Sequence, residues 1–269
     1  MKRFVTQYPV RFGFVVLALH MLIDPQSGWS QLPLQVLYLR IADYWHIPAY
    51  LSPNCLLPTY LVVNSVIALG LAASMRWCDT GVLSRISWRQ SYLLGLPIAA
   101  AIWPLAFVPI NVGGRQIIFV LISALLTALC NELLYRGVIL GALLPGGKVR
   151  ACLISALLSV GFYLPILNNL PTLLRTNSPD LLLLLIIIFS IGLSFAALRL
   201  RLNSVWPLVG VHTLSALTLL SIDMAQLSWT VAVVGIILPY SLLTIYGWHV
   251  LRADEHAAVR LRPALLEQS

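Results

Sequence analysis

The stretch LISALLTALCNELLYRGVILGALL, residues Leu121–Leu144, decides how this chain folds. A helix of about 20 apolar residues crosses the roughly 30 Å hydrocarbon core of a bilayer, and this stretch is long enough to do so. It nevertheless contains Glu132 and Arg136, the two charged residues that we place at membrane depth. A charge at the bilayer centre costs roughly 2.5–3.5 kcal/mol on insertion scales. We therefore expect these side chains to pair, for a structural or a chemical purpose.

The composition of the whole chain is that of a polytopic membrane protein. Of its 269 residues, 59% are hydrophobic and 10% are charged, and the mean hydropathy is +0.90. Soluble globular domains contain about 25% charged residues. We predict one transmembrane domain over residues 1–269, an all-α membrane helix bundle of about eight transmembrane helices. The expected spans are Phe12–Ile23, Leu56–Met75, Tyr92–Val112, Ile117–Leu144, Ala151–Leu167, Leu181–Leu198, Val205–Leu220 and Thr230–Val250.

The distribution of basic residues predicts the orientation of this bundle. With eight spans, only Arg40, Arg115 and Arg175 lie on one side of the membrane. The crowded side is cytoplasmic by the positive-inside rule. Both termini and a charged tail over residues 252–269 are then cytoplasmic, and we expect an integral protein of the cell membrane. The basic residues of the crowded side are Lys2, Arg3, Arg11, Arg76, Arg85, Arg89, Lys148, Arg150, Arg199, Arg201, Arg252, Arg260 and Arg262.

The remaining composition argues against several classes of function. The net charge of +8 follows from this topology and from contact with anionic lipid, and no nucleic-acid-binding motif is present. The four cysteines show neither CxxC nor Cys/His ligand spacing, so we expect no metal site and no disulfide framework. We expect no cofactor. The expected partners are the lipid bilayer and a membrane-associated peptide or protein.

Three polar features could form a site inside the bundle. Glu132 and Arg136 are four residues apart, so they share a helix face and can form an ion pair that orients helix packing. His212 is the distinctive polar residue of Val205–Leu220, and it can equally be a packing residue bonded to a nearby hydroxyl; His20 lies nearer a span end and ranks lower. The turn around Ser155, Ser159, Gly161 and Tyr163 combines small residues with a phenol, which permits close helix approach.

The order of these features resembles a known family. Asn131-Glu132-Leu133-Leu134-Tyr135-Arg136-Gly137, then Ser159 through Tyr163, then Trp206-Pro207 before His212, resemble the motifs of the CAAX protease and bacteriocin-processing (CPBP) family of intramembrane glutamic endopeptidases. The likeness covers about residues 117–220, which we take as the core. It implies an eight-helix enzyme that activates water with a Glu and a His to cleave membrane-associated peptides or prenylated proteins, without a metal or a covalent nucleophile.

The resemblance assigns site residues and also shows departures. Glu132 matches the second Glu of the family pattern, Arg136 matches its Arg, and His212 matches its second His. Tyr163 stands at the position of the first His, so the implied catalytic set is Glu132, Arg136, Tyr163 and His212. Asn131, Ser159 and Ala216 are altered positions, where the family has the water-activating Glu, a Phe and an Asn. An amide cannot take a proton from water, and a phenol is a poor base near neutrality.

Three functions fit these observations. The first is an intramembrane endopeptidase with an altered or weakened catalytic set. The second is a pseudoenzyme, a non-catalytic scaffold that binds a peptide or membrane protein as an immunity or maturation partner. The third is a small proton-linked transporter that uses Glu132, although the chain shows no internal repeat and no pair of broken helices.

Overall fold

A computed structural model describes residues 2–23, 52–75, 79–84, 88–108, 116–162, 180–221 and 229–266, and every regular element within these ranges is a helix. The chain is an integral membrane protein built from helices, as predicted. In the described ranges, three helical stretches are long and apolar enough to cross a membrane, and three shorter apolar helices accompany them. The count of eight spans stays a prediction. The long stretches are Val120–Gly146, Leu185–Leu202 and Val233–Ala253, and the shorter ones are Pro9–Met21, Leu61–Ser74 and Trp206–Leu219.

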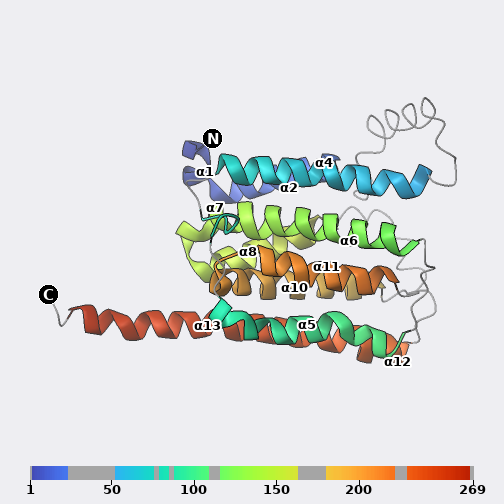
Figure 1. The fold of residues 1–269 in the computed structure, drawn as a ribbon. Coiled ribbons are helices and arrows are strands. Elements are labelled where there is room, and N and C mark those ends of the chain that lie inside the picture. The colour runs from blue at the N-terminus through green and yellow to red at the C-terminus, as the bar shows by residue number, and fades with distance from the viewer. Residues whose placement is uncertain are drawn as a thin grey trace.

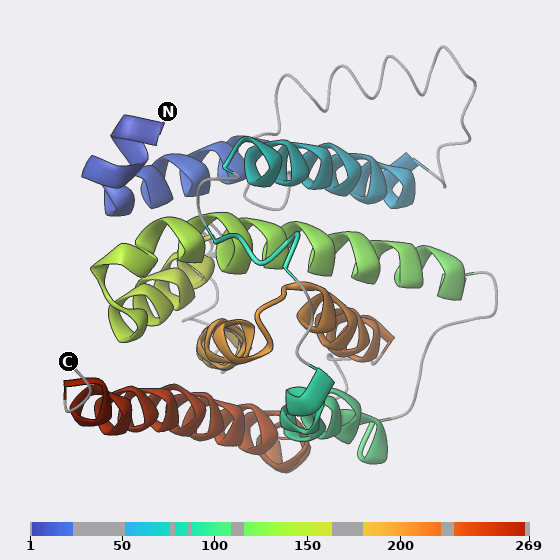
Figure 2. The same cartoon turned by 60° about the vertical axis from the view of Figure 1, so that its left-hand side comes forward.

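The helices lie side by side in layers (Figure 1). Helices α2 (Pro9–Ile23) and α4 (Ser52–Ser74) form one outer layer, and α5 (Gly95–Ile102) and α13 (Leu238–Leu266) form the opposite one. Between them lie α6 (Gln116–Asn131), α8 (Lys148–Gly161), α10 (Asp180–Leu202) and α11 (Trp206–Ser221), as Figure 2 also shows. Because α6 contacts α4 on one side and α11 on the other, the segment that carries Glu132 lies at the centre of the bundle.

Several expected elements have different bounds in the structure. The span expected at Tyr92–Val112 is divided into η2 (Trp88–Leu94), α5 and η3 (Trp103–Ala106), and a proline near the start of η3 explains that break. The second half of the span expected at Ala151–Leu167 lies outside the described residues. Helix α13 continues to Leu266, so the predicted charged tail begins as a helix, which extends beyond the bundle at the same end as α1 (Lys2–Gln7) in Figure 1.

The predicted helix over Leu121–Leu144 is present, but its middle is not α-helical. After α6 the chain forms the π-helix η4 (Glu132–Ile139), then α7 (Leu140–Leu143) and η5 (Leu144–Gly146). All eight residues of η4 are buried. A π-helix is rare, and its i→i+5 turns occur frequently at functional sites. The two charged residues of this stretch lie in η4.

Residues 79–84 form a loop that is fixed to the end of the bundle. Arg199 of α10, which is 1% exposed, donates hydrogen bonds of 3.0 and 2.6 Å to the two carboxylate oxygens of Asp79 and a further one to the Asp79 backbone carbonyl. Trp206 donates from its indole nitrogen to the Val82 carbonyl at 2.8 Å. A Cβ at Gly141 would lie 2.7 Å from the Asp79 carbonyl oxygen, so the loop packs directly on α7.

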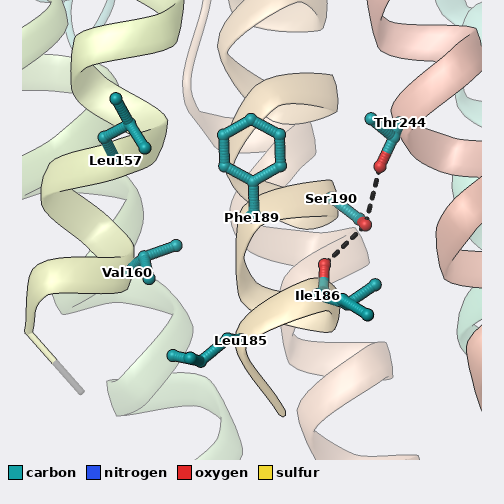
Figure 3. A pocket seen from close by; sticks show the side chains of 7 residues that line it. All are labelled: Leu157, Val160, Leu185, Ile186, Phe189, Ser190 and Thr244. Atoms are coloured by element: carbon teal, nitrogen blue, oxygen red, sulfur yellow. Dashed lines mark hydrogen bonds between the residues drawn. The ribbon is translucent and has the colours of Figure 1, made fainter. Parts of the chain in front are cut away.

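The packing of α10 against α13 leaves an apolar groove between α8, α10 and α13 (Figure 3). Ser190 donates a hydrogen bond of 2.6 Å to the Ile186 carbonyl and accepts one of 2.7 Å from Thr244, so the hydroxyls of this groove are satisfied within it. Its volume is about 290 Å³. Satisfied hydroxyls and apolar walls suit contact with acyl chains of the bilayer. The other lining residues are Leu157, Val160, Leu185 and Phe189.

Candidate functional site

Glu132 lies at the first residue of η4 and is completely buried. His212 of α11 donates from Nδ1 to Glu132 Oε1 at 2.6 Å, because a carboxylate can only accept. A guanidinium nitrogen of Arg136, itself 2% exposed, lies 3.5 Å from the same oxygen. The predicted pair of Glu132 and Arg136 is therefore present. The closer partner is His212, which lies 80 residues away in the sequence.

Four helices (α6, α8, α10 and α11) and η4 enclose a small cavity beside Glu132 and Arg136. Its volume is about 40 Å³, and a buried water needs roughly 10–15 Å³ of such space, so a few waters can occupy it. Among the described residues, Glu132 Oε2 and Arg136 Nε have no hydrogen-bond partner. Buried polar atoms are nearly always hydrogen-bonded, so these two atoms would attract water. The cavity is lined by Asn131, Tyr135, Arg136, Ser159, Ile188, Ile191 and His212.

The structure brings together most of the residues that the sequence singled out. Asn131 and Ser159, two altered positions, line the same cavity as His212. Ala216 lies one turn after His212 on α11 and presents no polar group. Tyr163 lies outside the described residues, so its predicted place in the site stays a prediction.

The small residues of α8 do permit close helix approach, as predicted. A Cβ at Gly192 of α10 would lie 3.0 Å from Ser159 Oγ and 3.1 Å from the Ala156 backbone. Ser155 is completely buried and donates a hydrogen bond of 2.7 Å to the Tyr135 carbonyl. Helix α8 is thus packed against α10 and bonded to the backbone of η4, and both neighbours carry residues that line the cavity.

A second polar cluster adjoins the site from α2. His20 is 4% exposed, and its Nδ1 lies 3.1 Å from the Tyr135 hydroxyl. Its Nε2 lies 3.6 Å from Cys130 Sγ, and its ring stacks on Phe162 with centroids 4.1 Å apart. From the sequence, His20 ranks low because it lies near a span end, and Tyr135 is not among the predicted site residues. The spacing of Tyr135, four residues after Asn131, was the available signal, because such residues share a helix face.

Cys130 of α6 and Cys152 of α8 are buried free thiols. Across the part of the chain that the structure describes, no group of three or more His, Cys, Asp or Glu side chains is arranged to hold a metal ion. The polar chemistry of the described site thus rests on one carboxylate, one imidazole, one guanidinium, an amide and two hydroxyls.

Comparison with known proteins identifies the segment that carries this site. Residues 113–218 match the family model described as Rce1-like, type II CAAX prenyl endopeptidase Rce1-like. No curated protein and no solved structure matches the chain. The matched residues include Asn131, Glu132, Arg136 and His212. The resemblance to the CPBP family is thereby confirmed for residues 113–218 of this integral membrane protein, the segment that is similar to the Rce1-like model.

Proposed function

We propose that this protein is an intramembrane endopeptidase that cleaves a CAAX-type or other membrane-associated peptide, with His212 as the general base. The observation that carries the proposal is the 2.6 Å hydrogen bond from His212 Nδ1 to the buried Glu132 carboxylate. A carboxylate bound to one ring nitrogen fixes the tautomer and orientation of a catalytic imidazole and stabilises the imidazolium that forms. The second nitrogen, Nε2, is then the one with a free lone pair.

The chemistry follows from this arrangement. His212 Nε2 takes a proton from a water molecule, and the water oxygen attacks the peptide carbonyl carbon. The Asn131 amide, on the same cavity wall, can orient the water or donate to the developing oxyanion. The imidazolium then gives its proton to the leaving amine. Glu132 takes no proton from the water in this scheme and keeps its contacts with His212 and the Arg136 guanidinium.

The cavity accommodates water more readily than substrate. A volume of about 40 Å³ is smaller than a peptide unit with its side chain, so we expect the scissile bond to enter when α10 or α11 moves. Ile188 and Ile191 of α10 form the apolar part of the lining and are the side chains that must give way. We propose that the end of the bundle holding α1, the loop 79–84 and the start of α8 is cytoplasmic, in agreement with the predicted bias of basic residues.

A cleavage assay with matched variants tests this function. Purified protein in lipid nanodiscs is given a fluorescence-quenched farnesylated CAAX peptide and the same peptide without the lipid. We expect His212→Gln to lower kcat about 10²–10⁴-fold, the usual contribution of a general base. We expect Glu132→Gln to do so comparably, because it removes the charge that stabilises the imidazolium. His249→Gln, the same change at an exposed histidine of α13, should leave the rate unchanged. Cleavage that survives His212→Gln would refute the role of His212.

A non-catalytic scaffold is the second candidate, and the altered positions favour it. Asn131 cannot act as a base, and Ala216 offers no oxyanion donor. A scaffold would bind the farnesylated peptide without cleaving it, with an affinity that Glu132→Gln leaves unchanged. Efficient cleavage that depends on Glu132 excludes this alternative.

A further inference from the structure

His20 is held more tightly than a packing residue requires. It comes from α2, a helix that contributes no residue to the cavity lining, yet its ring is fixed on three sides by Tyr135, Cys130 and Phe162. A buried imidazole needs hydrogen-bond partners for its two nitrogens. Here one partner, the Tyr135 hydroxyl, belongs to a residue of the cavity wall.

Tyr135 is held at both ends. Its hydroxyl contacts His20 Nδ1 at 3.1 Å, and its backbone carbonyl accepts the 2.7 Å hydrogen bond from Ser155. Its ring centroid lies 5.8 Å from the Arg136 guanidinium carbon, within the range of a cation–π contact. It lies within η4, three residues after Glu132. Helices α2 and α8 thus hold the π-helical turn that carries both charged residues of the site.

We propose that His20 is a positioning residue of the site: through Tyr135 it sets the geometry of η4, and so the placement of Glu132 and Arg136 against His212. A π-helical turn departs from the regular helix and persists where its surroundings support it. Tyr135 supplies that support from within the turn, and His20 fixes the direction of its side chain. The kinetic test of this inference rests on the proposed function. The spectroscopic test does not depend on it.

The two amide analogues of histidine give a matched test. The side-chain nitrogen of Asn occupies the place of Nδ1, whereas that of Gln occupies the place of Nε2. His20→Asn therefore keeps a partner for the Tyr135 hydroxyl, and His20→Gln does not. We expect His20→Gln to lower kcat about 10- to 100-fold at unchanged KM, since displacements of about 1 Å in a site have effects of this size. We expect His20→Asn to restore most of that loss, although this variant, unlike His20→Gln, gives up the contact of Nε2 with Cys130.

The hydroxyl of Tyr135 should account for the same effect. Tyr135→Phe is expected to match His20→Gln in kcat, and the double variant to be no worse than either single one, because both changes remove one hydrogen bond. Equal losses for His20→Asn and His20→Gln, or additive losses in the double variant, would show that His20 acts only through packing and would overturn the proposal.

A spectroscopic measurement separates this inference from the proposed function. The His212 Nδ1 proton, in its 2.6 Å hydrogen bond to Glu132, is expected to give a strongly downfield ¹H NMR resonance in ¹⁵N-histidine-labelled protein. If the wild-type protein cleaves no peptide, the endopeptidase proposal fails, and this resonance decides the role of His20. It should shift in His20→Gln and Tyr135→Phe and keep its wild-type position in His20→Asn. A resonance that is unchanged in all three variants would overturn the inference.

Discussion

Glu132 and Arg136 give the sharpest test of how the bundle tolerates charge, because the two side chains can be neutralised singly or together. Glu132→Gln keeps the size of the side chain and a carbonyl acceptor for His212, and removes the negative charge. Arg136→Met keeps most of the apolar volume and removes the positive charge. We expect each single variant to be clearly destabilised and the double variant to lose less stability than the sum of the two single losses.

The size of the effect follows from the 3.5 Å separation and the burial of both groups. Two unit charges at this distance attract by about 5 kcal/mol at an effective dielectric constant of about 20. Breaking a buried pair by removing one partner typically costs about 3–5 kcal/mol, since the remaining charge is left uncompensated. Replacing both partners by neutral groups avoids that cost. We therefore expect losses of roughly 3–5 kcal/mol for each single variant and a coupling free energy of about 3 kcal/mol or more.

Thermal unfolding of the purified protein in a mild detergent measures this coupling. A loss of 1 kcal/mol lowers Tm by roughly 2–4 °C in a chain of comparable size, so each single variant should unfold about 6–20 °C lower than wild type. Arg150→Met, the same change at an exposed arginine of α8, should stay within about 2 °C. Single variants with wild-type Tm, or a double variant whose loss equals the sum of the two, would show that the charges do not stabilise one another. The double variant should also be inactive, because His212 loses its carboxylate.

Two further predictions concern packing away from the site. Gly247→Ala should lower Tm by about 2–12 °C, because its Cβ would lie 2.6 Å from the Ser194 backbone and overpacking of this kind costs about 1–3 kcal/mol. Gly70→Ala, on α4 with no atom within 4 Å, should leave Tm equal or higher in the same thermal scan. Asp79→Asn should cost about 1–3 kcal/mol, because Arg199 is left buried without a charged acceptor although the Asp79 side chain is 50% exposed. Detergent unfolding measures this loss, and a wild-type midpoint would show that the Asp79 carboxylate does not anchor the loop.

Much of the fold could be predicted from the sequence because hydropathy alone places a chain in the bilayer and fixes its helices. The apolar length of Leu121–Leu144 was sufficient to predict a helix there. The π-helical turn could not be predicted, since nothing in the periodicity of Glu132–Ile139 marks an extra residue in the helix. Likewise, the loop bonded to Arg199 depends on a contact between residues 120 positions apart, and sequence spacing carries no signal for such a contact.

The sequence singled out several residues of the candidate site, but it predicted only part of their arrangement. Spacing of four residues correctly predicted that Glu132 and Arg136 approach each other, because that contact is local. The contact of Glu132 with His212 depends on the packing of α6 against α11, so the resemblance suggested both residues without giving their hydrogen bond. His20 was ranked low because it lies near a span end. The position of a histidine along the membrane normal does not show whether its side chain reaches a neighbouring helix.

The charges of the described site are consistent with an amide at the altered position Asn131. With an amide at Asn131, the described site holds one carboxylate and one guanidinium, whose formal charges balance. A second carboxylate at position 131, which is 7% exposed, would add a buried negative charge next to Glu132 in the sequence, and a buried charge without a partner of its own costs several kcal/mol. Compared with a glutamate at this position, the amide of Asn131 provides neither a base nor a buried charge. Glu132 is in contact with both His212 and Arg136, so under the proposed function the imidazole is the group left to take a proton from water.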